Sequence, residues 1–383
     1  MMRAGHLARH GACLSLLVIA TGLVHHRVLT AHQRLIDEKA YVEAFSLVTA
    51  GASPYEGAKY RYPPAFAVVG AAVLEALGER PAFLLLRGLD LLGICVVAWG
   101  AMIGSRWPLA VRAALAAAVL VSSPIVADGL QTGNVSFLFV AATVVALLAA
   151  SRRPRAAGAL LGSAIALKPL TAPVVPVLLV HRALSGARHP SLVAAVAALV
   201  AGALWSLVGI RFLGDFASRI GGLPDVSNVS FSHVLWCFGV EVPAVALFAV
   251  ITALGVWVAS RRPLGVRELL VLATSTSLLA LPINNPSTMV MSFPAQALAL
   301  ELAVGRWQAG SGRRWVPRWG ELLLVAAAAV SVHGSLGVVA ASSLSRPLRG
   351  LVALIPLLAV LGSTAYALAV PRAPAADPAA ARS

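Results

Sequence analysis

Charged side chains are scarce in this sequence, and acidic side chains are the scarcest. Only 12% of the 383 residues are charged, and 15 acidic residues stand against 30 Lys and Arg. Soluble domains carry about 25% charged residues, so the composition excludes an ordinary soluble globular protein. The 59% share of hydrophobic residues instead indicates a polytopic membrane protein. The basic residues lie between apolar runs, which is typical of membrane topology and contact with anionic lipid rather than of nucleic-acid binding.

Cysteine is also rare. Cys13, Cys95 and Cys237 are far apart, and the sequence contains no Cys-x-x-Cys pair. Neither a disulfide framework nor a metal-binding knuckle is therefore expected. The adjacent His25 and His26 would point apart on a helix. We expect no metal site and no cofactor, although these patterns leave a divalent cation open.

Long apolar runs separated by short polar segments predict the fold class. Because an apolar helix of about 20 residues crosses the membrane, the chain has room for about 11–13 membrane segments. We predict an all-α transmembrane helical bundle in one domain over residues 1–370, followed by a disordered Pro/Ala-rich tail at 371–383. Arginine clusters at 152–155 and 306–318 predict cytoplasmic loops. We expect a multi-pass protein of a bacterial cell membrane.

One part of the topology is ambiguous in the sequence. Three apolar runs, near 65–77, 82–103 and 109–121, follow one another with Arg80 and Arg106 between them. These two arginines cannot both be cytoplasmic if all three runs cross the membrane. One run is therefore expected to be short, tilted or re-entrant.

Residues 29–64 form the longest polar interval in the first half of the chain and are predicted to lie outside. Within this loop, apolar residues recur at helical spacing from Ile36 to Val48, with Asp37, Glu38 and Tyr41 on the other flank. This pattern predicts a short amphipathic helix in the membrane interface, ended by Gly51. The loop also collects four of the five tyrosines of the chain, which makes it the place where we expect chemistry.

A second unusual feature is a lysine within an apolar run. Lys168-Pro169 interrupts residues 156–180, and proline ends a helix at the residue before it. Two half-length helices that meet at Lys168 are predicted. An ionisable residue at membrane depth is costly, so Lys168 is a functional candidate.

Six motifs occur in order along the chain. They are Asp37-x-x-x-Tyr41, Gly51-x-x-Pro54-Tyr55, Tyr60-x-Tyr62-Pro63-Pro64, Gln131-x-Gly133-Asn134, Gly158-x-x-x-Gly162 with Lys168-Pro169, and Asn228-x-Ser230. Together they resemble glycosyltransferase family 87, whose members are integral membrane enzymes of the GT-C fold. That family is best known for mannosyltransferases that use polyprenyl-phosphate-mannose. The sequence departs from many members at 282–287, where it reads Pro-Ile-Asn-Asn-Pro-Ser in place of a Ser-Pro motif with Trp or His.

The resemblance implies a catalytic aspartate at Asp37. Glycosyl transfer to a hydroxyl needs a carboxylate that takes the proton, and Asp37 lies early in the outer loop. Glu38 and Asp128 are the alternative candidates for this base. Asp37 could also have no catalytic role and be only solvated or ion-paired. For the donor phosphate, the candidate cations are Lys168, Arg61 and Lys59. The candidates for binding sugar or acceptor are Tyr41, Tyr60, Tyr62, Gln131, Asn134 and Asn228.

The expected function is therefore transfer of a hexose, with mannose the first candidate, from a polyprenyl-phosphate donor. The acceptor would be a lipid or glycan on the outer face, and a single carboxylate base implies inversion at the anomeric carbon. No Asp-x-Asp is present, so the usual metal–nucleotide-sugar site of soluble glycosyltransferases is not expected. Two other classes stay open from the residues alone, a transporter or lipid flippase and a non-catalytic lipid-binding scaffold.

Overall fold

The computed structural model describes residues 4–31, 35–57, 60–181, 189–219, 230–281, 286–309, 344–370 and most of 321–330. All regular structure in these ranges is helical, so the predicted all-α membrane fold is confirmed. The elements that bear on the argument are α1 (Ala4–Val24), α2 (His26–Leu29), α3 (Ile36–Thr49), α4 (Pro64–Leu77), α5 (Glu79–Met102), α6 (Leu109–Ser122), α7 (Pro124–Thr132), α8 (Ser136–Ala149), α9 (Pro154–Leu167), η1 (Pro169–Thr171), α10 (Val174–Val180), α11 (His189–Val208), η2 (Ile210–Phe212), α12 (Leu213–Arg219), α13 (Phe231–Cys237), α14 (Ala244–Arg261), α15 (Val266–Ala280), η3 (Pro286–Ser292), α16 (Phe293–Ala309) and α19 (Arg346–Ala369).

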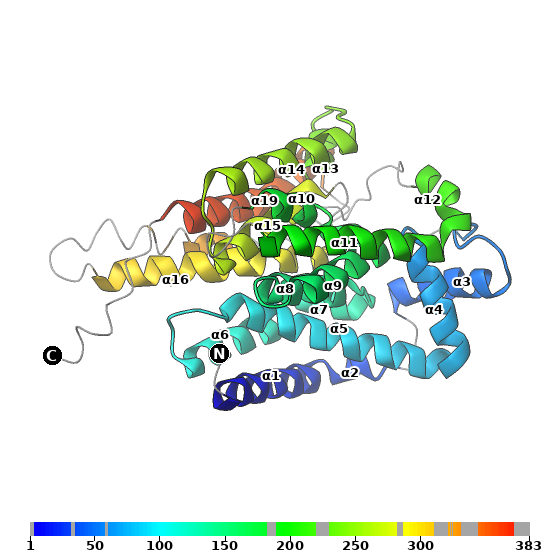
Figure 1. The fold of residues 1–383 in the computed structure, drawn as a ribbon, viewed down its shortest axis with the longest axis horizontal. Helices are drawn as coiled ribbons and strands as arrows, with labels where there is room; N and C mark the ends of the chain where they lie inside the picture. Colours follow the sequence, from blue (N-terminus) through cyan, green and yellow to red (C-terminus); the bar gives the residue numbers. More distant parts are fainter. Residues whose placement is uncertain are drawn as a thin grey trace.

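The long helices lie along one common direction, which we take as the membrane normal (Figure 1). Five described helical segments are long and apolar enough to cross a membrane, and the bent pair α6–α7 makes six. Four further apolar helices are shorter: Ala8–Val24, Pro64–Leu77, Ser136–Ala149 and Pro154–Leu167. The larger number of segments expected from the sequence stays a prediction.

Helix α4 resolves the ambiguity over the three apolar runs. Figure 1 shows α4 almost at right angles to α5, at the end of the bundle that also carries α3 and α12. A Cβ on Gly70 of α4 would lie 2.1 Å from the ring of Phe45 on α3, so these two helices pack closely. Helix α4 therefore lies across the direction taken as the membrane normal, and Arg80 and Arg106 fall at opposite ends of α5.

Small residues allow α9 and α11 to pack at backbone contact. A Cβ on Gly158 or Gly162 of α9 would lie 2.1 Å from the backbone oxygen of Ala194 or Ala198 on α11. Within a membrane, helices associate through such close packing rather than through the hydrophobic effect. The Gly-x-x-x-Gly motif thus fixes α9, the helix that ends at Lys168.

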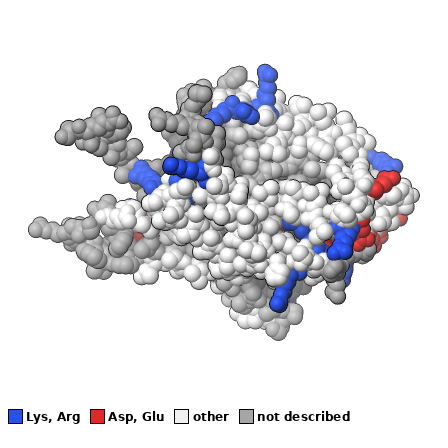
Figure 2. All heavy atoms as spheres, turned by 90° about the horizontal axis from the view of Figure 1, so that it is seen from below, with Lys and Arg blue, Asp and Glu red and all other residues white. Residues whose placement is uncertain are grey.

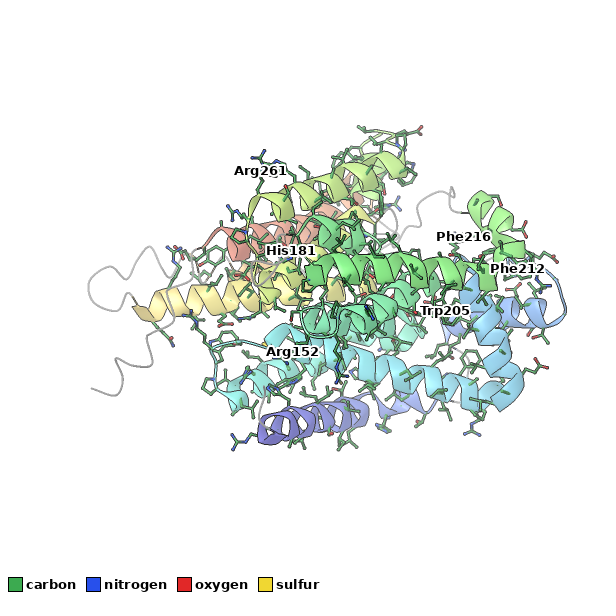
Figure 3. All side chains as sticks on the ribbon, viewed as in Figure 1. Arg152, His181, Trp205, Phe212, Phe216 and Arg261 are labelled. Atoms are coloured by element: carbon green, nitrogen blue, oxygen red, sulfur yellow. The ribbon has the colours of Figure 1, made fainter. Side chains whose placement is uncertain are left out.

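The two ends of the bundle differ in their side chains. On the face shown in Figure 2, most of the visible acidic residues gather at the end where Figure 1 places α3, α4 and α12. Figure 3 shows Arg152 and Arg261 toward the opposite half, and Phe212 and Phe216 at the α3 end. The loop at Arg152 therefore lies away from the α3 end, whereas most of the 306–318 cluster falls outside the described residues, so a shared cytoplasmic side for the two loops stays a prediction. Which side faces the cytoplasm stays a prediction.

Candidate active site

Helix α3 carries the candidate base in its first turn. Leu35 is extended before the helix, and the Glu38 carboxylate accepts a hydrogen bond from its backbone N–H at 2.8 Å. Acidic residues in a first turn also suit the helix dipole. The buried side of α3, which includes Tyr41, Ala44 and Phe45, packs against α4. Asp37 is half-buried and four residues before Tyr41, so the two lie on neighbouring turns of one face. The predicted helix is confirmed, but its faces differ from the prediction: Glu38 and Tyr41, expected on the polar flank, are buried, and Ile36, expected on the apolar flank, is 66% exposed.

Glu38 is held in a buried ion pair, which separates its role from that of Asp37. Both carboxylate oxygens accept hydrogen bonds from the Arg87 guanidinium of α5, at 2.5 and 2.6 Å. Arg87 also donates to the backbone oxygen of Ala31 at 2.8 Å. A fork-to-fork pair of this kind fixes both partners. Glu38 therefore serves to dock α3 on α5, and Asp37 is the carboxylate of this turn that remains for chemistry.

Lys168 lies where the membrane helix breaks, as predicted. Pro169 holds the preceding residue in an extended conformation, with φ −153° and ψ 105°, and α9 stops at Leu167. The ammonium group donates to Asn134 Oδ1 at 2.7 Å, to Ser136 Oγ at 2.8 Å and to the Tyr62 hydroxyl at 3.4 Å. These three acceptors take up all three ammonium protons, which is how the buried charge is satisfied.

The turn between α7 and α8 supplies two of these acceptors, Asn134 and Ser136, which together form a cradle for the Lys168 ammonium. Gly133 ends α7 in the left-handed region at φ +73°, a conformation that favours glycine. A Cβ at Gly133 would also lie 3.0 Å from Glu38 Cγ, so the turn packs directly on α3. Asn134 Oδ1 accepts a hydrogen bond from the Ser136 backbone N–H at 3.0 Å at the start of α8. The Gln131-x-Gly133-Asn134 motif is thus a helix end followed by a turn that presents one amide.

Asp37 is joined electrostatically to this cradle. Burial raises the pKa of Asp37 above its ordinary value, while the charge of Lys168 and a hydrogen bond from the Asn134 side chain lower it, and the charge of Glu38 raises it. A carboxylate whose pKa is raised is a better proton acceptor near neutral pH. The structure therefore brings Asp37, Asn134 and Lys168 together from three separate segments.

Asp128 on α7 is the second carboxyl of the site. It interacts electrostatically with Asp37 and accepts a backbone hydrogen bond from Ser287 in η3. The alternative base suggested by the sequence therefore lies near the first one.

The tyrosines form an aromatic layer under the site. Tyr41 donates to the Tyr62 hydroxyl at 3.1 Å, and both rings pack edge-on against Phe66. Burial raises the pKa of Tyr62, so its phenol stays protonated. Tyr41 is fully buried, and Tyr60 is buried with its hydroxyl on Pro63 O at 3.1 Å. Tyr62 is the one of these three rings that is partly exposed. Tyr41 and Tyr60 could therefore contact a sugar, as expected from the sequence, only if the aromatic side chains that bury them moved apart.

The remaining predicted residues fall outside the cluster of Asp37, Asn134 and Lys168. Arg61 and Gln131 are exposed. Lys59 and Asn228 lie outside the described residues. No group of three or more metal-binding side chains occurs in the described ranges.

Three residues of the site were not predicted from the sequence: Arg87, Asp90 and Ser136. Arg87 and Asp90 are both buried in the membrane helix α5. Their signal was a pair of ionisable residues inside an apolar run, which marks a functional or pairing role. Ser136 carried no such signal, because serine is common in any helix start.

Comparison with known proteins identifies the family. The family model of glycosyltransferase family 87 matches residues 60–282, which is more than half of the chain. The chain belongs to glycosyltransferase family 87. It is therefore a glycosyltransferase, and the transporter and scaffold alternatives are set aside. The match contains Tyr62, Asn134 and Lys168 but begins after Asp37, whose assignment rests on its contacts. No curated protein and no solved structure matches the chain.

Proposed function

We propose that this family 87 enzyme transfers a hexose, mannose being the first candidate, from a polyprenyl-phosphate donor to a lipid or glycan acceptor. The reaction takes place on the outer face of the membrane, at the end of the bundle that carries α3. The observation that supports the proposal is the meeting of Asp37, Asn134 and Lys168 at the break of a membrane helix. A lipid donor reaches such a site sideways from the bilayer, and the apolar helices around it suit that path.

In the proposed step, Asp37 acts as general base. Its carboxylate takes the proton of the acceptor hydroxyl as that oxygen attacks the anomeric carbon. The bond between the anomeric carbon and the phosphate oxygen breaks, and the polyprenyl phosphate leaves with the electron pair. A single direct displacement inverts the configuration. Asn134 orients the Asp37 carboxylate through their hydrogen bond.

The leaving phosphate needs a cation where its charge develops. Lys168 is the first candidate, and a phosphate oxygen would take the place of the Tyr62 hydroxyl, its longest contact at 3.4 Å. Arg61 is exposed and adjacent to Tyr62, so its guanidinium is free to turn toward the same phosphate. Lys59 and Asn228 remain proposed contacts to donor and sugar, together with Tyr62 and Gln131.

The test uses membranes that contain the full chain, supplied with radiolabelled polyprenyl-phosphate-mannose. We expect Asp37→Asn to lower the initial rate by about 10²–10⁴-fold, the usual loss for a general base. Glu43→Gln is the matched control, because Glu43 is an exposed acid on the same helix. Glu38→Gln is not a suitable control, since it breaks the buried pair with Arg87.

Each outcome separates one part of the proposal. Transfer by the wild type and by Glu43→Gln but not by Asp37→Asn supports it. Full activity of Asp37→Asn would contradict Asp37 as the base, and Asp128→Asn is then the next variant. If the wild type transfers glucose or galactose from the same lipid but no mannose, the proposed sugar is wrong, and the proposed roles of the site residues are unaffected.

A further inference from the structure

Two neighbouring charged residues of α5 face different parts of the site. Arg87 and Asp90 are three residues apart, so they lie on one face of the helix, and both are buried. Arg87 binds Glu38 of α3, as described above. Asp90, which is 4% exposed, accepts a hydrogen bond from the Leu138 backbone N–H at 3.0 Å. Helix α5 therefore holds α3 with one side chain and α8 with the next.

The contact of Asp90 satisfies the start of α8. The first N–H groups of a helix have no partner within it, and a buried one needs an acceptor from elsewhere. One turn later on α5, a Cβ on Gly93 would lie 2.8 Å from the backbone of Phe137 and Leu138. The two helices thus approach to backbone contact beside Asp90, and a change in its length or polarity moves the first turn of α8.

That first turn and the two residues before it carry the groups that hold Lys168. Asn134 and Ser136 hold the Lys168 ammonium at 2.7 and 2.8 Å, and the Asn134 side chain bonds Asp37. Leu138, the partner of Asp90, is two residues after Ser136. The placement of Asn134 against Asp37 therefore depends on the contact between α8 and Asp90.

We propose that Asp90 is a positioning residue for glycosyl transfer, which anchors the start of α8 so that Asn134 and Lys168 face Asp37. The assignment rests on the proposed role of Asp37 as base. It does not require Asp90 to touch either substrate. Because the anchor is an oxygen acceptor, its amide replacement keeps the contact, whereas an apolar replacement of similar size loses it.

The test compares Asp90→Asn, which keeps an oxygen acceptor, with Asp90→Leu, which does not. The first readout needs no substrate. A carbodiimide modifies protonated carboxyls, so the pH at which Asp37 becomes half-modified, read by mass spectrometry of its peptide, reports its protonation. The groups that face Asp37 are Lys168, Asn134, Glu38, Asp128, Tyr41 and Tyr62. Loss of the Asn134 bond raises the pKa of Asp37, so the half-modification pH moves upward in Asp90→Leu but not in Asp90→Asn.

The second readout is transfer from radiolabelled polyprenyl-phosphate-mannose. We expect Asp90→Leu to lose at least about tenfold in kcat with a smaller change in KM, and Asp90→Asn to recover most of the rate. Ile94→Ala is the control for general destabilisation, because Ile94 is a fully buried α5 residue one turn beyond Asp90. It lowers stability without moving the pH of half-modification.

The outcomes decide between the two proposals. Equal half-modification pH in the wild type and Asp90→Leu overturns the role of Asp90, as does an equal shift in Asp90→Asn. If Asp90→Leu is not recovered from membranes, Asp90→Ser replaces it, since its shorter side chain does not reach Leu138. Full activity of Asp37→Asn would instead refute the proposed base, and the modification experiment would still decide whether Asp90 positions Asn134.

Discussion

Replacing Arg87 tests whether the ion pair with Glu38 holds the catalytic end together. The Arg87 and Glu38 side chains are 8% and 3% exposed, and they share two hydrogen bonds of 2.5 and 2.6 Å. Arg87→Met removes the positive partner and leaves Glu38 buried and unpaired. Breaking a buried pair in this way costs about 3–5 kcal/mol. The variant also removes the donor to Ala31 O, so the upper part of this range is expected.

The informative comparison is the double variant Arg87→Met with Glu38→Gln. Removing both charges takes away the uncompensated carboxylate, and the remaining amide still accepts the Leu35 N–H. We expect the double variant to recover more than half of the lost free energy of unfolding. The measurement is unfolding in mixed micelles by titration with a denaturing detergent, on wild type, both single variants and the double variant.

Two results would refute this reasoning. A double variant as unstable as Arg87→Met would mean that the loss comes from the backbone oxygens near Ala31 and not from the unpaired charge. A cost below about 1 kcal/mol for Arg87→Met would place the pair among exposed salt bridges, which contribute little.

Two further predictions concern the charge of the site and its side of the membrane. Lys168 lowers the pKa of Asp37, so Lys168→Met raises it, and the base is then deprotonated only at higher pH. The acid limb of kcat/KM moves upward in the pH profile of transfer, and an unmoved limb would mean that Lys168 does not act on Asp37. In a variant without the native cysteines, an impermeant maleimide added outside labels Glu56→Cys but not Ser151→Cys, because exposed Glu56 follows α3 at one end of the bundle, whereas exposed Ser151 adjoins Arg152 in the opposite half (Figure 3). The reverse pattern would put the site in the cytoplasm.

Local sequence signals were sufficient where one segment determines its own structure. The spacing of apolar residues and Gly51 predicted α3 and its end, and Pro169 predicted the break at Lys168. The direction of α4 could not be predicted in this way. Its 14 residues, apolar except for Glu75, fit a short membrane segment, and tertiary contacts such as that of Phe45 with Gly70 accompany its position across the end of the bundle.

The candidate site was predicted in part, and the missing part has a physical reason. Lys168 is unusual within an apolar run, Asp37 and Asn134 belong to the motifs that resemble the family, and the structure brings the three together. The predicted sugar contacts Tyr41 and Tyr60 prove to be buried, because a phenol in an interface loop looks the same in sequence whether it faces solvent or the core. Which partner a buried charge takes depends on tertiary packing, so no local pattern could pair Arg87 with Glu38.

The α7–α8 turn shows why a weak motif can determine a whole site. Gly133 packs on Glu38, Asn134 bonds both Asp37 and Lys168, Ser136 bonds Lys168, and the backbone of Leu138 bonds Asp90. Segments that are distant in sequence therefore meet along six consecutive residues. Each of these contacts uses a backbone group or a short polar side chain, which leaves little compositional trace. Because the turn joins base and cation, a shift of its backbone changes both at once, and the geometry of the site depends more on this turn than on either ionisable residue alone.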